Sequence, residues 1–104
     1  HGQGTLVTRD GHRYQGAFVN GQPHGHGVFG SANGNTFDGQ WDHDKAHGYG
    51  KFTHRDGSSY EGEWKEDMKS GTGVERWRDG ARYHGEFLHG GKHGAGIYTS
   101  GTGV

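Results

Sequence analysis

The sequence predicts an all-β protein, an elongated single-layer antiparallel sheet built from consecutive β-hairpins. Three observations lead to this prediction. A pattern of aromatic residues and glycines recurs every 23 residues, alternating segments surround the glycines, and Asp-Gly or Asn-Gly pairs stand between these segments. No stretch has apolar residues at the three- and four-residue spacing of an amphipathic helix. An internal period of this length is typical of repeat proteins, whose units stack on their neighbours.

The clearest repeated element is a pentapeptide with aromatic residues at both ends and glycine at its centre, and its copies begin at residues 14, 37, 60 and 83. We therefore predict one repeat domain over residues 1–104, of about four and a half units, with partial units at both ends. We also expect the chain to be a piece of a longer protein. The aromatic residues of the four copies are Tyr14, Phe18, Phe37, Trp41, Tyr60, Trp64, Tyr83 and Phe87.

Each unit contains two predicted strands. In the first, residues 13–19, alternation places Tyr14 and Phe18 on one face and Gln15 and Ala17 on the other. The glycine between the two aromatic residues leaves room for a ring to lie over bare backbone. Most outward positions in the copies of this strand are polar, which predicts one packed face and one wet face.

The second strand is predicted over residues 26–31, with copies near 49–54, 72–77 and 95–100. It carries an apolar residue at Leu6, Phe29, Phe52 and Tyr98, whereas Glu75 interrupts this column. Trp77 lies two residues further along, and therefore on the same face of the strand. We expect the Trp77 ring to cover the gap.

The connections predict antiparallel neighbours. An Asp-Gly or Asn-Gly pair such as Asp10-Gly11 supplies the positive φ angles of a type I′ hairpin turn, and we expect that turn here. The other connection, residues 20–23 and its copies, is expected to be longer and less uniform. Nine strands at the usual separation of about 4.8 Å would make a rod of roughly 40 to 45 Å.

The composition limits the classes of function. The chain has 26% hydrophobic residues and a mean hydropathy of −1.12, which excludes a thick core; disorder is disfavoured because most of the 24 glycines hold a fixed register. Eleven basic and 12 acidic residues leave a net charge of −1, so we expect no nucleic-acid partner. The sequence contains no cysteine and no long apolar run.

The motifs for catalysis and for cofactors are weak. Gly25-His26-Gly27-Val28-Phe29-Gly30 has the spacing of a dinucleotide-binding loop, but it follows no βα unit, and the serines stand in no nucleophile elbow. We therefore expect no enzyme activity and no cofactor. The ten histidines include no HExxH motif, so we expect no metal site, with intramolecular or shared zinc as the alternative. The histidines relevant to that alternative are His24, His26, His84, His89 and His93.

The full pattern resembles a known family. A Tyr-x-Gly-x-Trp/Phe pentapeptide, a His-Gly-x-Gly tetrad at His1, His24, His47 and His93, and an Asp/Asn-Gly pair at 23-residue spacing resemble MORN repeats, the membrane occupation and recognition nexus motif. Three positions depart from the pattern: Phe37, Ser70 and Glu75. The resemblance covers essentially the whole chain, and it implies a sheet of hairpins that serves as a non-catalytic binding or scaffolding module.

The aromatic face is the predicted binding site. Its eight pentapeptide rings are expected to pack the sheet and also to receive a partner peptide or helix, and the chain is expected to self-associate as a homodimer. The resemblance implies a cytoplasmic protein in a cytoskeletal or membrane-linked assembly. Two alternatives are an accessory module of an enzyme whose catalytic domain lies outside this chain, and a phospholipid-binding surface. The lipid alternative rests on Lys65, Lys69, Arg76, Arg78 and Arg82.

Overall fold

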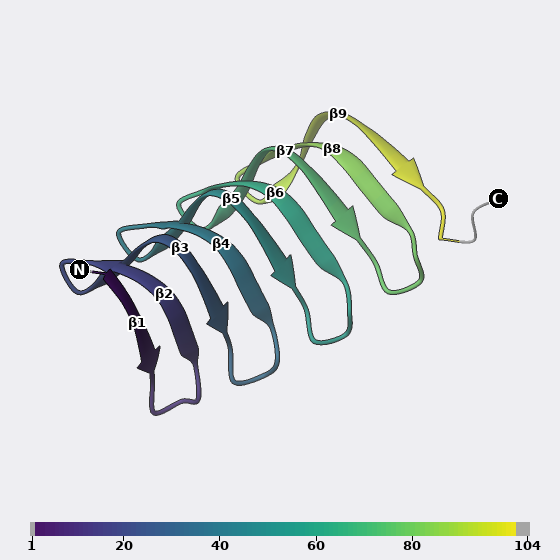
Figure 1. Ribbon diagram of the computed structural model, residues 1–104. Coiled ribbons are helices and arrows are strands. Elements are labelled where there is room, and N and C mark those ends of the chain that lie inside the picture. Colours follow the sequence, from purple (N-terminus) through teal and green to yellow (C-terminus); the bar gives the residue numbers. More distant parts are fainter. Residues whose placement is uncertain (1, 102–104) are drawn as a thin grey trace.

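The computed structural model describes residues 2–101, which form nine strands and no helix. The strands pair in sequence order into one antiparallel sheet, which confirms the predicted fold class. Figure 1 shows the hairpins side by side along one axis, with β1 and β9 at opposite ends. The strands are β1 (Gly2–Val7), β2 (Arg13–Val19), β3 (Gln22–Gly30), β4 (Thr36–Asp42), β5 (Lys45–Thr53), β6 (Ser59–Lys65), β7 (Met68–Arg76), β8 (Arg82–Leu88) and β9 (Gly91–Thr99).

The sheet is an elongated, bent trough. Its principal extents are 48 × 25 × 17 Å, and the longest of them slightly exceeds the length expected for nine strands. The strands curve along their length (Figure 1). A bulge recurs in alternate strand pairs: between β2 and β3, Gly16 pairs with Gly27 but Phe18 pairs with Pro23. Such bulges bend the strand that contains them, which accounts for the curvature.

The bulge explains the His-Gly-x-Gly motif. Gly25, the first glycine of the tetrad at His24, lies in the bulge with a φ of 92°, a conformation that L residues rarely adopt. Its equivalents Gly48, Gly71 and Gly94 also have positive φ. The tetrad that begins at His1 includes a residue outside the described range. The motif therefore marks a backbone kink in each described repeat.

The predicted bounds are correct for the first strand of a unit and wrong for the second. The first, residues 13–19, has the predicted bounds, whereas the second begins at Gln22 instead of residue 26. The prediction was wrong because the connection before it is a two-residue turn. Asn20 and Gly21 have φ of 52° and 78°, and Val19 pairs directly with Gln22. This is the geometry of a type I′ hairpin.

The Asp-Gly and Asn-Gly loops were expected to be type I′ turns, and that expectation is corrected. In the first loop the Gly11 amide donates to the Thr8 carbonyl at 3.1 Å, and Gly11 has positive φ while Asp10 does not. The three residues 9–11 therefore form a type I turn followed by a left-handed glycine. A type I′ turn and a type I turn followed by a left-handed glycine both suit the right-handed twist of the strands. The presence of an Asp-Gly pair therefore does not distinguish between them.

A row of glycines crosses the middle of the sheet. Gly16 pairs with Gly27 and Gly27 pairs with Gly39, and the pattern continues to Gly96 in β9. A Cβ atom added to Gly27 would overlap the Tyr14 ring, which lies over this row. The central glycine of the pentapeptide was predicted to leave this room, and that prediction is corrected: a Cβ atom on Gly16 would chiefly meet the backbone of Gly27 and His26, and the glycine beneath the Tyr14 ring is Gly27 in the neighbouring strand. The core is thus a single layer of rings lying on glycine.

Candidate functional site

The eight pentapeptide rings form one continuous zigzag along the sheet. Each ring contacts the next edge-to-face, with centroids 4.8 to 5.6 Å apart, which is the favoured geometry for aromatic pairs. In order along the zigzag, the rings are Phe18, Tyr14, Trp41, Phe37, Trp64, Tyr60, Phe87 and Tyr83. The zigzag joins every unit to its neighbour.

Five of these rings are buried, although Tyr14 and Phe37 also line part of the groove described below. The five are Tyr14, Phe37, Tyr60, Tyr83 and Phe87, none more than 9% exposed. Two of the tyrosines are also held by hydrogen bonds, because their hydroxyls donate to the carbonyls of Ala17 and Glu63 at 2.9 and 3.0 Å. Burial, together with the charges of Glu63 and Glu75, raises the pKa of Tyr60 to about 12.

The remaining rings, Phe18, Trp41 and Trp64, are half-buried. The Trp41 indole N–H donates to the Gly27 carbonyl at 3.1 Å, and the Trp64 indole N–H donates to the Gly50 carbonyl at 3.0 Å. These hydrogen bonds satisfy the only polar group of each indole and fix the ring against the preceding hairpin. The apolar surfaces of Trp41 and Trp64 line a groove in the first part of the aromatic face.

That groove lies over β1–β6 and has a volume of about 520 Å³. Its apolar walls include Phe29 and Phe52 from the second-strand column, which were not among the predicted binding residues. The type I′ turns contribute the carboxylates of Asp44 and Asp67. The groove is therefore an apolar surface with acidic groups beside it.

Over β6–β9, charged side chains lie on the rings of the aromatic face. The Lys69 ammonium contacts the Glu75 carboxylate at 3.0 Å, and Lys92 contacts the other oxygen of the same carboxylate at 3.1 Å. Lys69 lies over the Tyr60 ring and Lys92 over the Tyr83 ring, at 5.1 and 5.3 Å from the ring centroids. The interruption of the apolar column at Glu75 is thus an ion cluster lying on the rings.

Glu75 is held in its ionised form. Burial by itself would raise the pKa of this carboxyl, which is 19% exposed, but the hydrogen bonds and charges of Lys69 and Lys92 outweigh burial and place the pKa below its ordinary value. Trp77 was expected to cover the gap at this position. Its ring packs against the cluster of Tyr60, Tyr83 and Phe87, and Lys92 lies over it at 5.3 Å.

The five basic residues of the lipid alternative do not share one surface. Lys69 lies on the aromatic face within the ion cluster. Arg76 and Arg82 are cross-strand partners on the opposite face, where Arg76 lies 3.9 Å from Glu61. Lys65 lines a hollow of about 450 Å³ beside the turns after β6 and β8, and Lys69 also borders it. Arg78 lies in the loop after β7.

Potential metal ligands gather elsewhere, on the face opposite the rings. Among residues 2–101, one group of three side chains brings its ligand atoms within 4.8 Å of one another: His24, Asp42 and His43. Only His24 of these three was among the histidines considered for zinc from the sequence. The signal was hard to find because the ligands come from two neighbouring strands and the turn after β4.

A comparison with protein-family models identifies the repeat. A family model described as MORN repeat matches five consecutive segments that together span the chain: residues 1–13, 14–36, 37–59, 60–82 and 83–104. Four of the matches begin at the aromatic residue that opens a pentapeptide. No curated protein matches the sequence. Within the part of the chain that the structure describes, no helix is long and apolar enough to cross a membrane.

Proposed function

We propose a function from the premise that this chain belongs to the MORN-repeat family, whose repeats are generally modules for interaction with proteins or membranes. In our proposal the chain is a non-catalytic protein-interaction scaffold that binds a helical segment of a partner protein in the groove over β1–β6. The segment has an apolar face flanked by lysine or arginine. As the family resemblance implies, we place this activity in the cytoplasm, in a cytoskeletal or membrane-linked assembly.

The observation that supports this proposal most is the chemistry of the groove. Half-buried Trp41 and Trp64 offer large apolar surfaces on a rigid floor, since their rings are fixed by hydrogen bonds and by the aromatic zigzag. Such anchored aromatic groups contribute most of the binding free energy in protein interfaces. An amphipathic helix can bury its apolar face in a groove of this kind.

The charge at the groove favours a basic peptide over a lipid headgroup. Asp44 and Asp67 would attract lysine or arginine beside the apolar face of a helix, whereas they would repel an anionic phosphate. Asp67 also accepts a hydrogen bond from the Ala46 amide at 2.7 Å, so its carboxylate is held in place. Lys69, Arg76 and Arg82, from the lipid alternative, are divided between the two faces of the sheet.

The experiment measures binding of a fluorescent model helix that carries leucines on one face and lysines beside them. The chain's own repeats supply the variants, because phenylalanine stands at positions 18 and 87, equivalent to Trp41 and Trp64. Trp41→Phe with Trp64→Phe keeps the zigzag and shortens the groove walls, and we expect binding to weaken by about tenfold. Trp77→Phe, outside the groove, is the matched control and should leave binding unchanged.

The charge requirement is tested with the same helix after its lysines are replaced by glutamate. We expect fluorescence anisotropy to show much weaker binding of the acidic helix at low salt. Equal binding of both helices, or equal binding by wild type and the double tryptophan variant, would contradict the proposal. Sedimentation of the chain with phosphatidylserine liposomes at physiological salt would instead favour the lipid alternative.

Self-association is the second part of the proposal. Light scattering on the isolated chain measures its mass directly, and a dimer whose formation is blocked by the basic helix would place the second copy in the groove. A monomer at all concentrations would leave the groove to other proteins and would remove homodimerisation from the proposal.

A further inference from the structure

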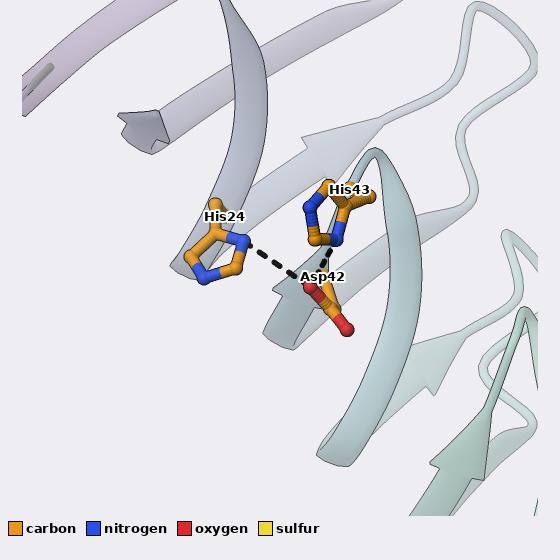
Figure 2. Close-up of side chains that lie close together, drawn as sticks. All are labelled: His24, Asp42 and His43. Atoms are coloured by element: carbon orange, nitrogen blue, oxygen red, sulfur yellow. Dashed lines mark ion pairs between the residues drawn. The ribbon is translucent and has the colours of Figure 1, made fainter. Parts of the chain in front are cut away.

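Three side chains converge on the polar face, at the end of the sheet where the type I′ turns lie. Figure 2 shows His24 and His43 on either side of Asp42, with both rings directed at the same carboxylate oxygen. The Nδ1 atom of His24 lies 3.3 Å from Asp42 Oδ1, and the Nδ1 atom of His43 lies 2.6 Å from it. The two imidazole rings are 5.4 Å apart between centroids.

The fold itself brings these groups together. His24 stands in the bulged part of β3, next to the pairing of Gly25 with Trp41, and Asp42 is the last residue of β4. His43 is the first residue of the type I′ turn, with a φ of 48°, and histidine is one of the residues that tolerate this conformation. The His24 and Asp42 side chains are 41% and 45% exposed, and the His43 side chain is 77% exposed, so the group is open to solvent.

The combination is specific to one repeat. The positions equivalent to Asp42 are occupied by Val19, Lys65 and Leu88, and those equivalent to His43 by Asn20, Glu66 and His89. His24 belongs to the tetrad, but Ser70 occupies its position in another repeat. The repeat therefore folds with many residues at these three positions. The fold therefore does not require histidine or aspartate at any of these positions.

We propose that His24, Asp42 and His43 form a binding site for a divalent transition-metal ion, with zinc as the preferred ion. Two imidazole nitrogens and one carboxylate oxygen are ligands that zinc takes readily, and three protein ligands leave one position for water or for a group from another molecule. The three ligand atoms already lie within 4.8 Å of one another. A bound ion would replace the direct contact between His43 and Asp42 and would join β3 to the turn after β4.

The chain offers substitutions that remove each ligand with little change to the fold. His43→Asn reproduces Asn20 in the equivalent turn, and His24→Ser reproduces Ser70 at the equivalent bulge. Asp42→Asn keeps the size of the side chain and removes its charge. His89→Asn is the matched control, because His89 holds the same place in a type I′ turn, preceded by Leu88 instead of an aspartate.

Zinc chloride alone is titrated into each variant by calorimetry, and the melting temperature is recorded with and without the ion. We expect one saturable site in the wild type, a rise in melting temperature that a chelator reverses, and an affinity loss of about tenfold or more in each ligand variant. His89→Asn should bind zinc as the wild type does. In an NMR spectrum of the imidazole nitrogens, the signals of His24 and His43 should shift on zinc addition.

Three outcomes would overturn the proposal: no saturable zinc binding by the wild type, loss of affinity in His89→Asn equal to that in the ligand variants, or zinc-induced shifts confined to other histidines. Circular dichroism of each variant separates loss of a ligand from loss of the fold. The peptide-binding groove lies on the opposite face, so the result is independent of the proposed scaffold function.

Discussion

The first and second parts of the aromatic face share one backbone and differ in what lies on the rings. Over β1–β6, Pro23 and Ala46 stand at one position of the repeat, and Phe29 and Phe52 stand at another. These apolar residues and the tryptophans line an open groove. In the next repeat the same two positions hold Lys69 and Glu75, which form an ion pair over the Tyr60 ring. Lys92 also pairs with Glu75 and completes the ion cluster.

The difference between these regions separates two roles of the repeat. The zigzag of rings and the glycine row run through both parts, so they are what the fold needs. The residues above the rings vary, so they determine whether the face can accept a partner. The residues at these two positions of the repeat thus decide whether the rings face an open apolar groove or are covered by an ion cluster.

The largest expected effect comes from the glycine row, which the two regions share. A Cβ atom on Gly50 would overlap the Phe37 ring, and one on Gly73 would overlap the Tyr60 ring. We expect Gly50→Ala and Gly73→Ala each to lower the free energy of unfolding by about 3 kcal/mol, measured by urea titration. Gly30→Ala, where an added methyl group meets open space, is the control. A small loss in only one of the two variants would show that its ring has room to move.

A smaller effect should distinguish the two regions at Glu75. Glu75→Ala leaves the ammonium groups of Lys69 and Lys92 without their shared carboxylate, and we expect a loss of about 1–2 kcal/mol in urea unfolding. Combining Lys69→Ala with Glu75→Phe copies Ala46 and Phe52 from the first region. Because apolar replacements of ion pairs are often neutral, this double variant should recover most of that stability. If it were less stable than Glu75→Ala, the two regions would differ in more than their side chains.

The smallest effect concerns pH. The pKa of Glu75 lies below its ordinary value of 4.5, so its contribution to stability is complete above that pH. It is lost as the pH falls from 4.5 through the folded-state pKa. The difference in unfolding free energy between wild type and Glu75→Gln should therefore shrink when urea titrations at pH 7 are repeated at pH 3. A difference that stays constant would mean that the ion cluster does not stabilise the fold.

Much of the fold was predictable from the sequence because a strict period repeats each local signal. The pentapeptide predicted the bounds of β2 correctly, and it predicted a ring lying on a glycine, although that glycine belongs to the neighbouring strand and not to the pentapeptide. The type of each connection was not predictable in the same way. Asp-Gly suits both a type I′ turn and a type I turn followed by a left-handed glycine, and His43-Asp44 shows no glycine at all in a true type I′ turn.

The candidate sites were predictable only in part. The sequence indicated an aromatic face, but it did not show that five rings are buried and that Trp41 and Trp64 remain accessible beside Phe29 and Phe52. Accessibility depends on which side chain of the next hairpin lies over a ring. For the same reason, the five basic residues near one another in the sequence lie on different surfaces.

The sequence by itself determined the repeat, the antiparallel order of strands and the layer of rings on glycine, because these follow from residue types at fixed local spacing. The tertiary structure alone decided where the groove is open, where an ion cluster closes the face, and that His24, Asp42 and His43 meet. These features depend on register and on the bulge, which bring together side chains that are far apart in the sequence.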